Sequence, residues 1–244
     1  MCGIVGIYHR SASAEIDRGL LQRMNDVQTH RGPDGEGIHV EPGLGLGHRR
    51  LSIIDIEGGS QPMANDSGDV VIVYNGEVYN FPELRTELEH WGVKFHTRCD
   101  TEVILQSYIR WGAACVEKLR GMFAFAIWDQ NQQSLFLARD RLGIKPLFYC
   151  YENERLIFAS ELKSLLEDSQ LPREIDPQAV EDYFQFGYIP DPKTIFHGVK
   201  KLPPGYILQI DRTLAEPRVK KYWDVEFAHT SKQGEAEAGE ELID

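Results

Sequence analysis

The sequence has 244 residues, of which 42% are hydrophobic and 26% are charged, a balance typical of a globular protein with a sizeable core. Its formal net charge of −12 argues against nonspecific binding to nucleic acid or to an anionic membrane, because both need a basic surface. No apolar run approaches the roughly 18 residues of a membrane helix, and no basic segment precedes the first apolar stretch, as a secretory signal would require. The 4 cysteines match no disulfide or zinc spacing, which favours a reduced, cytoplasmic setting without a metal site.

Strand patterns dominate the first third of the chain. A buried strand is expected over residues 2–9, followed by an amphipathic helix over 15–28 and a turn cluster rich in glycine and proline over 30–37. Short apolar or alternating runs then predict strands over residues 38–40, 44–48, 51–54 and 70–75.

Helices and strands are grouped rather than alternating in the rest of the chain. Helices are predicted over residues 81–92, 100–111 and 113–119, and later over 161–166 and 177–186. Between them, a meander of four strands is predicted over residues 122–128, 134–139, 147–151 and 155–159, with a further strand over 206–210. This segregation favours an α+β fold with layered antiparallel sheets. The polar, acidic stretch from about residue 227 is typical of a linker.

The second residue is a candidate nucleophile. Cys2 follows the initiator methionine, which is usually removed when the next residue is small. The processed chain would then carry an α-amine and a thiol on one residue. An α-amine ordinarily titrates at about 7.7–8.0 and a thiol at about 8.5, so this amine can serve as the general base for its own sulfur. Taken alone, however, a cysteine at this position is most often an ordinary residue.

A series of short motifs gives Cys2 a context. In chain order they are CGIVG (2–6), HRGPDG (30–35), GHRRLSI (47–53), QP (61–62), NGEVYN (75–80), DTEV (100–103), GMFAFA (121–126), RDRLGIKPL (139–147) and ASELK (159–163). Together they resemble the glutaminase domain of glutamine-hydrolysing asparagine synthetases. That family belongs to the class II glutamine amidotransferases, which are N-terminal nucleophile hydrolases. The resemblance covers about residues 2–225 and implies a four-layer α/β/β/α sandwich of two antiparallel sheets between helix layers.

The resemblance also implies a reaction. Cys2 would attack the side-chain amide of L-glutamine, forming a glutamyl thioester and ammonia, and water would then release L-glutamate. Asn75 and Gly76 match the residues of the family's oxyanion hole, where a side-chain amide and a main-chain N–H stabilise the developing negative charge. The local alternative is an ordinary Asn-Gly turn between two strands.

Further residues match the family's substrate contacts. Arg50 matches the arginine that holds the α-carboxylate of glutamine, and its planar guanidinium suits a bidentate contact. The neighbouring Arg49 is the better candidate for a surface ion pair. Leu51 and Ile53 match residues whose main-chain groups contact the substrate.

Two carboxylates complete the expected binding site. Glu77 and Asp100 match the residues that receive the substrate ammonium group, although Asp100 would also suit the N-cap of a helix. Two carboxylates and one arginine would match the ammonium and the carboxylate of a free amino acid, and would thus select free glutamine over glutamine within a peptide. The turn over residues 30–34 resembles an outer support for the nucleophile strand and is not expected to be catalytic.

One departure from the family pattern is large. Asparagine synthetases carry a C-terminal domain with an SGGxDSS loop for ATP, and no such loop occurs here. We therefore expect a glutaminase domain over residues 1–225 and an acidic linker over 226–244, with no cofactor of its own and ATP and Mg²⁺ confined to the missing synthetase domain. Expected partners are L-glutamine, that synthetase domain and, as an open alternative, a second copy in a homodimer. An acceptor other than aspartate, or an inactive docking domain, are the competing interpretations.

Overall fold

Two six-stranded antiparallel sheets form the centre of the molecule. A computed structural model describes residues 1–52, 55 and 58–226. The first sheet has the order β10-β8-β9-β1-β3-β2 and the second the order β12-β11-β7-β6-β5-β4. The first contains β1 (Gly3–His9), β2 (Gly35–Glu41), β3 (Leu44–Arg50), β8 (Phe148–Glu152), β9 (Arg155–Ala159) and β10 (Val199–Lys201). The second contains β4 (Met63–Ala64), β5 (Val70–Val78), β6 (Gly121–Asp129), β7 (Ser134–Arg139), β11 (Tyr206–Asp211) and β12 (Arg218–Lys221).

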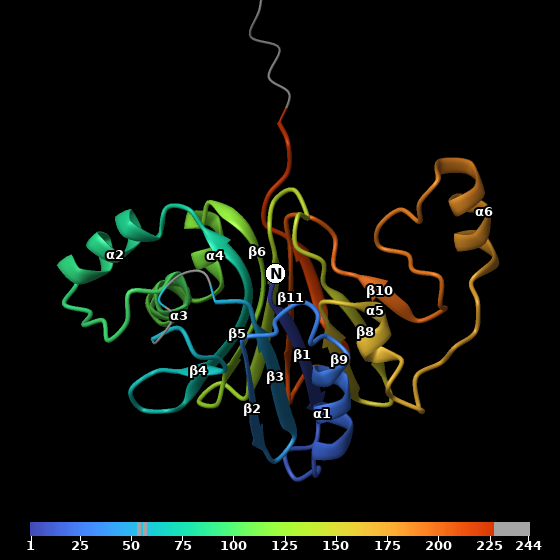
Figure 1. The fold of residues 1–244 in the computed structure, drawn as a ribbon, viewed down its shortest axis with the longest axis horizontal. Helices are drawn as coiled ribbons and strands as arrows, with labels where there is room; N and C mark the ends of the chain where they lie inside the picture. Colours follow the sequence, from blue (N-terminus) through green and yellow to red (C-terminus); the bar gives the residue numbers. More distant parts are fainter. Residues whose placement is uncertain (53–54, 56–57, 227–244) are drawn as a thin grey trace, which may run out of the picture.

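Helices cover the outer faces of both sheets, as Figure 1 shows. The first sheet packs against α1 (Arg18–Asp26) and α5 (Leu162–Leu165), and the second against α2 (Phe81–His90), α3 (Asp100–Trp111) and α4 (Cys115–Lys118), the last preceded by a 3-10 turn over Gly112–Ala114. The helix α6 (Pro177–Phe186) lies to one side of these layers. The expected α/β/β/α sandwich is therefore confirmed.

Alternation along the strands builds three apolar layers. In β5, Val71 and Val73 pack between the sheets, whereas Ile72 and Tyr74 face the α2–α4 layer. In β1, Tyr8 faces the other sheet and Ile7 faces α1. Successive side chains of a strand point to opposite faces, so continuous apolar runs predict strands covered on both sides. That burial explains why both runs are almost uniformly hydrophobic.

Helix ends follow local chemistry. Asp17 caps α1 by accepting a hydrogen bond of 2.9 Å from the Leu20 amide, and Asp176 caps α6 by accepting one of 2.9 Å from the Gln178 amide. Gly187 ends α6 with a φ of 77°, a left-handed conformation that favours glycine. Within the described part of the chain, no helix is long and apolar enough to cross a membrane.

The predicted four-strand meander is wrong. β6 and β7 lie in the second sheet, whereas β8 and β9 lie in the first. The change of sheet takes place around Asp140, which is fully buried. Its carboxylate accepts hydrogen bonds of 2.9–3.1 Å from the amides of Phe123, Leu142, Ile144 and Lys145, and so fixes a turn that apolar periodicity does not reveal.

Other predictions also need correction. Leu51 and Ser52 lie outside any strand because β3 ends at Arg50, and residues 53 and 54 lie outside the described residues. The short strands β4, β10 and β12 were not predicted, and α1 is shorter than the expected helix. The linker expected over 226–244 falls, from residue 227 on, outside the described residues.

Candidate active site

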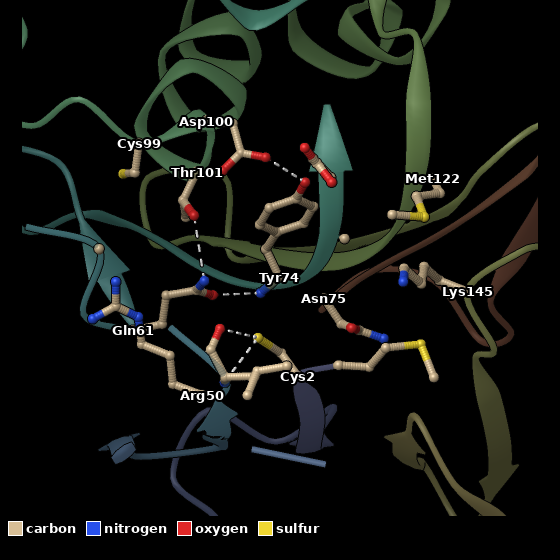
Figure 2. Close-up of a pocket in the computed structure, with 15 residues that line it drawn as sticks. Cys2, Arg50, Gln61, Tyr74, Asn75, Cys99, Asp100, Thr101, Met122 and Lys145 are labelled. Carbon is tan, nitrogen blue, oxygen red and sulfur yellow. Dashed lines mark hydrogen bonds between the residues drawn. The ribbon is translucent and has the colours of Figure 1, made fainter. Parts of the chain in front are cut away.

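A cavity of about 170 Å³ lies between the sheets, where β1 begins and β3 ends in the first sheet and the C-terminal half of β5 runs in the second (Figure 2). Every predicted site residue lines it except Ile53, which lies outside the described residues. The lining residues are Met1, Cys2, Arg50, Leu51, Gly59, Gln61, Tyr74, Asn75, Gly76, Glu77, Cys99, Asp100, Thr101, Met122 and Lys145. Residues up to about 140 positions apart in sequence thus share one cavity, although their chemical roles stay predictions.

The sulfur of Cys2 is held at the start of β1. The Leu51 amide donates to Cys2 Sγ at 3.4 Å, and the thiol lies 3.7 Å from the Leu51 carbonyl oxygen (Figure 2). The Cys2 carbonyl accepts a hydrogen bond of 2.8 Å from Arg31 Nε, and the same guanidinium contacts Glu161 at 3.0 Å. Arg31, from the predicted supporting turn, therefore fixes the main chain of Cys2 and leaves its sulfur facing the cavity.

The amino terminus also lies beside the cavity, where it belongs to Met1. Burial lowers the pKa of this amine below its usual value, and the positive charges of Arg31 and Lys145 lower it further. The sulfur of Cys2 and the carboxylate of Asp34 act in the opposite direction. A terminal amine in this environment loses its proton more readily than one in water, which favours a role as a base.

Asn75 and Gly76 lie within β5, so the alternative of an Asn-Gly turn is wrong. Asn75 pairs with Ala124 and Gly76 with Phe123 of β6. Asn75 is 1% exposed, and neither its amide nitrogen nor its amide oxygen has a hydrogen-bond partner among the described residues. A buried, unpaired amide carries a desolvation cost that a bound polar group can relieve.

The main-chain N–H of Gly76 faces the open edge of β5. Main-chain groups of successive residues in an antiparallel strand point to opposite sides, so those of every second residue point the same way. The N–H groups of Tyr74 and Val78 are bonded to side chains on the side away from β6, so Gly76, between them, points the same way. A Cβ at Gly76 would lie 2.3 Å from the Met122 carbonyl oxygen, which only glycine avoids.

Arg50 and Arg49 take different directions from the end of β3. Arg50 lines the cavity, and its Nη2 donates a hydrogen bond of 2.6 Å to the Asp55 carbonyl. A Cβ at Gly59 would lie 2.4 Å from this Nη2, so a larger residue there would displace the guanidinium. Arg49 instead forms surface ion pairs with Asp26 and, at 2.7 Å, with Glu36. This is the division between the two arginines that the sequence predicted.

Asp100 and Glu77 also line the cavity. Asp100 is 5% exposed, and its Oδ2 accepts hydrogen bonds of 2.7 Å from the Tyr74 hydroxyl and 3.0 Å from the Val78 amide (Figure 2). Burial raises the pKa of Asp100, and these two hydrogen bonds oppose that rise. The N-cap of α3 is Cys99, with Asp100 as the first helical residue, so the alternative of a plain N-cap is wrong.

Sequence reasoning missed several lining residues. Gln61 binds both Tyr74 and Thr101, and Lys145 places its ammonium in the cavity although its side chain is 4% exposed (Figure 2). Burial lowers the pKa of Lys145, as does the charge of Arg31. Both Gln61 and Lys145 belong to the short sequence motifs that carry the family resemblance, and that membership was the available signal. No group of three or more His, Cys, Asp or Glu side chains suited to a metal ion occurs within residues 1–52, 55 and 58–226.

Comparisons with known proteins agree on one family. A family model described as a glutamine amidotransferase domain matches residues 1–223. "Asparagine synthetase [glutamine-hydrolyzing] 1" of Bacillus subtilis is 45% identical over 207 residues, which cover 84% of this chain and 33% of that protein. "Amidase chry2" of Gibberella zeae is 36% identical over 240 residues, covering 93% of this chain and 35% of that protein. The chain thus spans about a third of the length of these curated relatives.

A solved structure with the same fold is the glutamine phosphoribosylpyrophosphate amidotransferase from B. subtilis. It superposes with a TM-score of 0.65 at 20% sequence identity, over 91% of this chain and 49% of that one. At this identity the likeness establishes the arrangement of sheets and helices, which agrees with the four-layer sandwich expected from the sequence.

Proposed function

The chain belongs to the glutamine amidotransferase domain family, and from that premise we propose that it hydrolyses L-glutamine to L-glutamate and ammonia, with Cys2 as the nucleophile. One observation carries the proposal. The sulfur of Cys2 shares a single cavity with the unpaired amide of Asn75 and with Gly76, whose N–H faces the open edge of β5. These are the nucleophile and the two oxyanion donors that the reaction needs.

The reaction begins once Met1 has been removed. The freed α-amine of Cys2 takes the thiol proton, and the sulfur attacks the δ-carbon of the glutamine amide. The carbonyl oxygen becomes an oxyanion that accepts hydrogen bonds from the Asn75 amide and the Gly76 N–H. Collapse of this intermediate breaks the C–N bond, and the amine returns its proton to the leaving ammonia. Water, activated by the same amine, then attacks the thioester and releases L-glutamate.

Charged groups on two sides of the cavity would recognise the rest of the substrate. Arg50 would bind the α-carboxylate, while Asp100 and Glu77 would receive the α-ammonium. Main-chain groups of Leu51, and of Ile53 beyond the described residues, would add further contacts. Since both charges of a free amino acid are matched, glutamine within a peptide should be rejected.

The wider role rests on the relatives. Because a relative is named a glutamine-hydrolysing asparagine synthetase, we propose that the ammonia serves an ATP-dependent asparagine synthetase-type domain, where ATP and Mg²⁺ would act. On this proposal residues 1–225 form the glutaminase domain and 226–244 lead toward the synthetase domain. The amidase among the relatives supports one alternative, an acceptor other than aspartate.

The free cysteines support a cytoplasmic setting. A homodimer of this chain stays an open alternative, and the molar mass from light scattering tests it.

Intact mass spectrometry of the amino terminus, combined with a glutamate-release assay, tests the core of the proposal. A sample that lacks Met1 should release glutamate and ammonia in equal amounts, and the Cys2→Ala variant should release neither. Met-free protein that makes no glutamate, or a Cys2→Ala variant that still makes it, would refute the proposed reaction. An inactive domain kept for docking would give the first of these results.

A further inference from the structure

The main chain of Tyr74 is bonded to two side chains where a neighbouring strand would normally lie. β4 pairs with β5 only at Val71 and Ile72, so among the residues that the structure describes no strand lies beside the edge of β5 beyond them. At this edge the Tyr74 N–H donates to Gln61 Oε1 at 2.7 Å, and the Tyr74 carbonyl accepts from His48 Nε2 at 3.0 Å. Both groups of the residue just before Asn75 are therefore held by side chains.

His48 connects this segment to the strand of the nucleophile. It lies on β3 directly opposite Ile4 of β1, two residues after Cys2, and its side chain is fully buried between the sheets. A carbonyl can only accept a hydrogen bond, so Nε2 must carry the proton. Burial lowers the pKa of His48 to about 4, which keeps the imidazole neutral near pH 7. Its Nδ1 has no partner among the described residues, as that tautomer allows.

Gln61 connects the same segment to the substrate side. While Oε1 accepts from Tyr74, Nε2 donates to Thr101 Oγ1 at 3.3 Å, next to Asp100 at the start of α3 (Figure 2). The main chain of Gln61 also lies close to Gly37, where a Cβ would be 2.2 Å from the Gln61 carbonyl oxygen. Gly37 in turn pairs with His48. Gln61 is thereby fixed against the first sheet as well as against α3.

We propose that His48 and Gln61 are positioning residues for the oxyanion hole, which hold Tyr74, and through it Asn75 and Gly76, at a fixed place relative to Cys2. The inference rests on the proposed glutaminase function. In the proposed reaction neither His48 nor Gln61 touches the reacting atoms. Since the Tyr74 carbonyl and the Asn75 N–H belong to one planar peptide unit, a hydrogen bond to that carbonyl fixes the plane from which the Asn75 side chain projects. A shift of 1 Å in such donors can cost about 100-fold in rate.

The decisive comparison is between His48→Leu and His48→Gln. Leucine cannot donate to the Tyr74 carbonyl, whereas the amide of glutamine can place a donor near the former Nε2 position. We expect His48→Leu to lower kcat for glutamine hydrolysis about 10- to 100-fold with KM within about threefold, and His48→Gln to restore most of kcat. His90→Leu is the matched control, because the exposed His90 also bonds a main-chain carbonyl, that of Thr86, away from the cavity.

The affinities of His48→Leu for two ligands distinguish a positioning role of His48 from a general effect on folding. The γ-semialdehyde of glutamate adds the Cys2 sulfur to its carbonyl carbon, the thiol proton passing to the amine, and the resulting oxyanion needs the hole. The product glutamate forms no such adduct. In His48→Leu the affinity for the aldehyde should fall in parallel with kcat, while the affinity for glutamate stays within about threefold. Equal losses for both ligands, unchanged kcat in His48→Leu, or a His48→Gln variant as impaired as His48→Leu would overturn the proposal.

Gln61 provides a second test should His48→Leu not fold. Gln61→Met removes both side-chain hydrogen bonds at a partly exposed site, and we expect kcat and aldehyde affinity to fall together by at least about tenfold. An unchanged kcat would contradict the inference. If wild-type protein without Met1 releases no glutamate, the proposed function fails instead. Hydrogen exchange at the Gly76 amide then still tests the positioning role, with faster exchange expected in Gln61→Met and equal exchange refuting it.

Discussion

The Tyr74 hydroxyl donates a hydrogen bond of 2.7 Å to Asp100, which joins the outer face of β5 to the first residue of α3. Burial raises the pKa of Tyr74 well above its usual value, so the hydroxyl stays protonated and remains a donor. Asp100 thereby keeps a partner that favours its charged form, although burial raises the pKa of its own carboxyl group. The strand of the oxyanion hole and the expected binder of the substrate ammonium are thus coupled.

Tyr74→Phe should therefore weaken glutamine binding most strongly at acid pH. Loss of the hydroxyl removes a hydrogen bond that lowers the pKa of Asp100, so this pKa rises further and less of the carboxylate is charged at a given acid pH. We expect KM to rise by at least about threefold at pH 5 and much less at pH 8, with little change in kcat. The exposed Tyr79→Phe is the control. A KM increase that is the same at both pH values would show that Asp100 does not bind the ammonium.

Arg50→Ala should raise KM for glutamine about 10- to 100-fold, with a smaller effect on kcat, since hydrogen bonds to charged groups contribute about 1.5–3 kcal/mol. Arg49→Ala is a matched control on the next residue, because its ion pairs with Asp26 and Glu36 lie at the surface. Steady-state kinetics of the two variants decides the matter. Equal KM values for Arg50→Ala and wild type would show that another group binds the α-carboxylate.

Gly76→Ala should impair both stability and rate. The new Cβ would lie 2.3 Å from a main-chain oxygen of β6, so β5 must move. We expect a loss of about 1–3 kcal/mol in the free energy of unfolding and a decrease in kcat of about 100-fold. Gly35→Ala, whose Cβ would meet only Arg50 Cβ at 3.7 Å, should stay within about 0.5 kcal/mol of wild type. Urea unfolding and glutamate release measure the two effects, and a fully active Gly76→Ala variant would rule out a close approach at this position.

His48 should make the protein less stable in acid. Its pKa is lowered from 6.5 to about 4 by burial, so the folded state favours the neutral imidazole. The contribution of His48 to the free energy of unfolding is therefore fully present above about pH 6.5. It is lost as the pH falls toward about 4, and the total loss is about 3 kcal/mol. His48→Gln lacks this titration, so the difference in unfolding free energy between wild type and variant should change over that interval. Parallel pH profiles would contradict a buried, neutral His48.

Lys145→Met should move the acid limb of the kcat/KM profile to higher pH. In the structure the charges of Lys145 and Arg31 lower the pKa of the terminal amine, which belongs to Met1. We expect the same charges to act on the adjacent α-amine of Cys2 once Met1 has been removed, so loss of the Lys145 charge lets that amine hold its proton to higher pH. Lys145→Arg keeps the charge and should leave the limb nearly in place, and Lys200→Met tests an exposed lysine. A shift of the acid limb to lower pH would show that the amine is not the group that titrates.

The sequence predicted the elements better than their arrangement. Continuous apolar runs identified β1 and β5 because both faces of these strands are covered, and the start of α6 was marked by Pro177 after an aspartate cap. The sheet change after β7 escaped prediction because it depends on Asp140, a buried carboxylate bonded to four main-chain amides. The motifs named the expected site residues, and the described ones line one cavity, while their roles stay predictions. His48 and Gln61 lie within the motifs too, but their contact with the main chain of Tyr74 was not predicted, because a residue pattern does not encode a main-chain partner.

The turn around Asp140 has a structural consequence. Between β7 and β8 it directs Lys145 into the cavity while Leu142 and Ile144, which are 69% and 54% exposed, face outward. One carboxylate bonds the amides of all three residues, so the same side chain fixes the main chain on the surface side and on the cavity side of the turn. Two exposed apolar side chains and one cavity-lining ammonium thus take their places from a single buried carboxylate between the sheets.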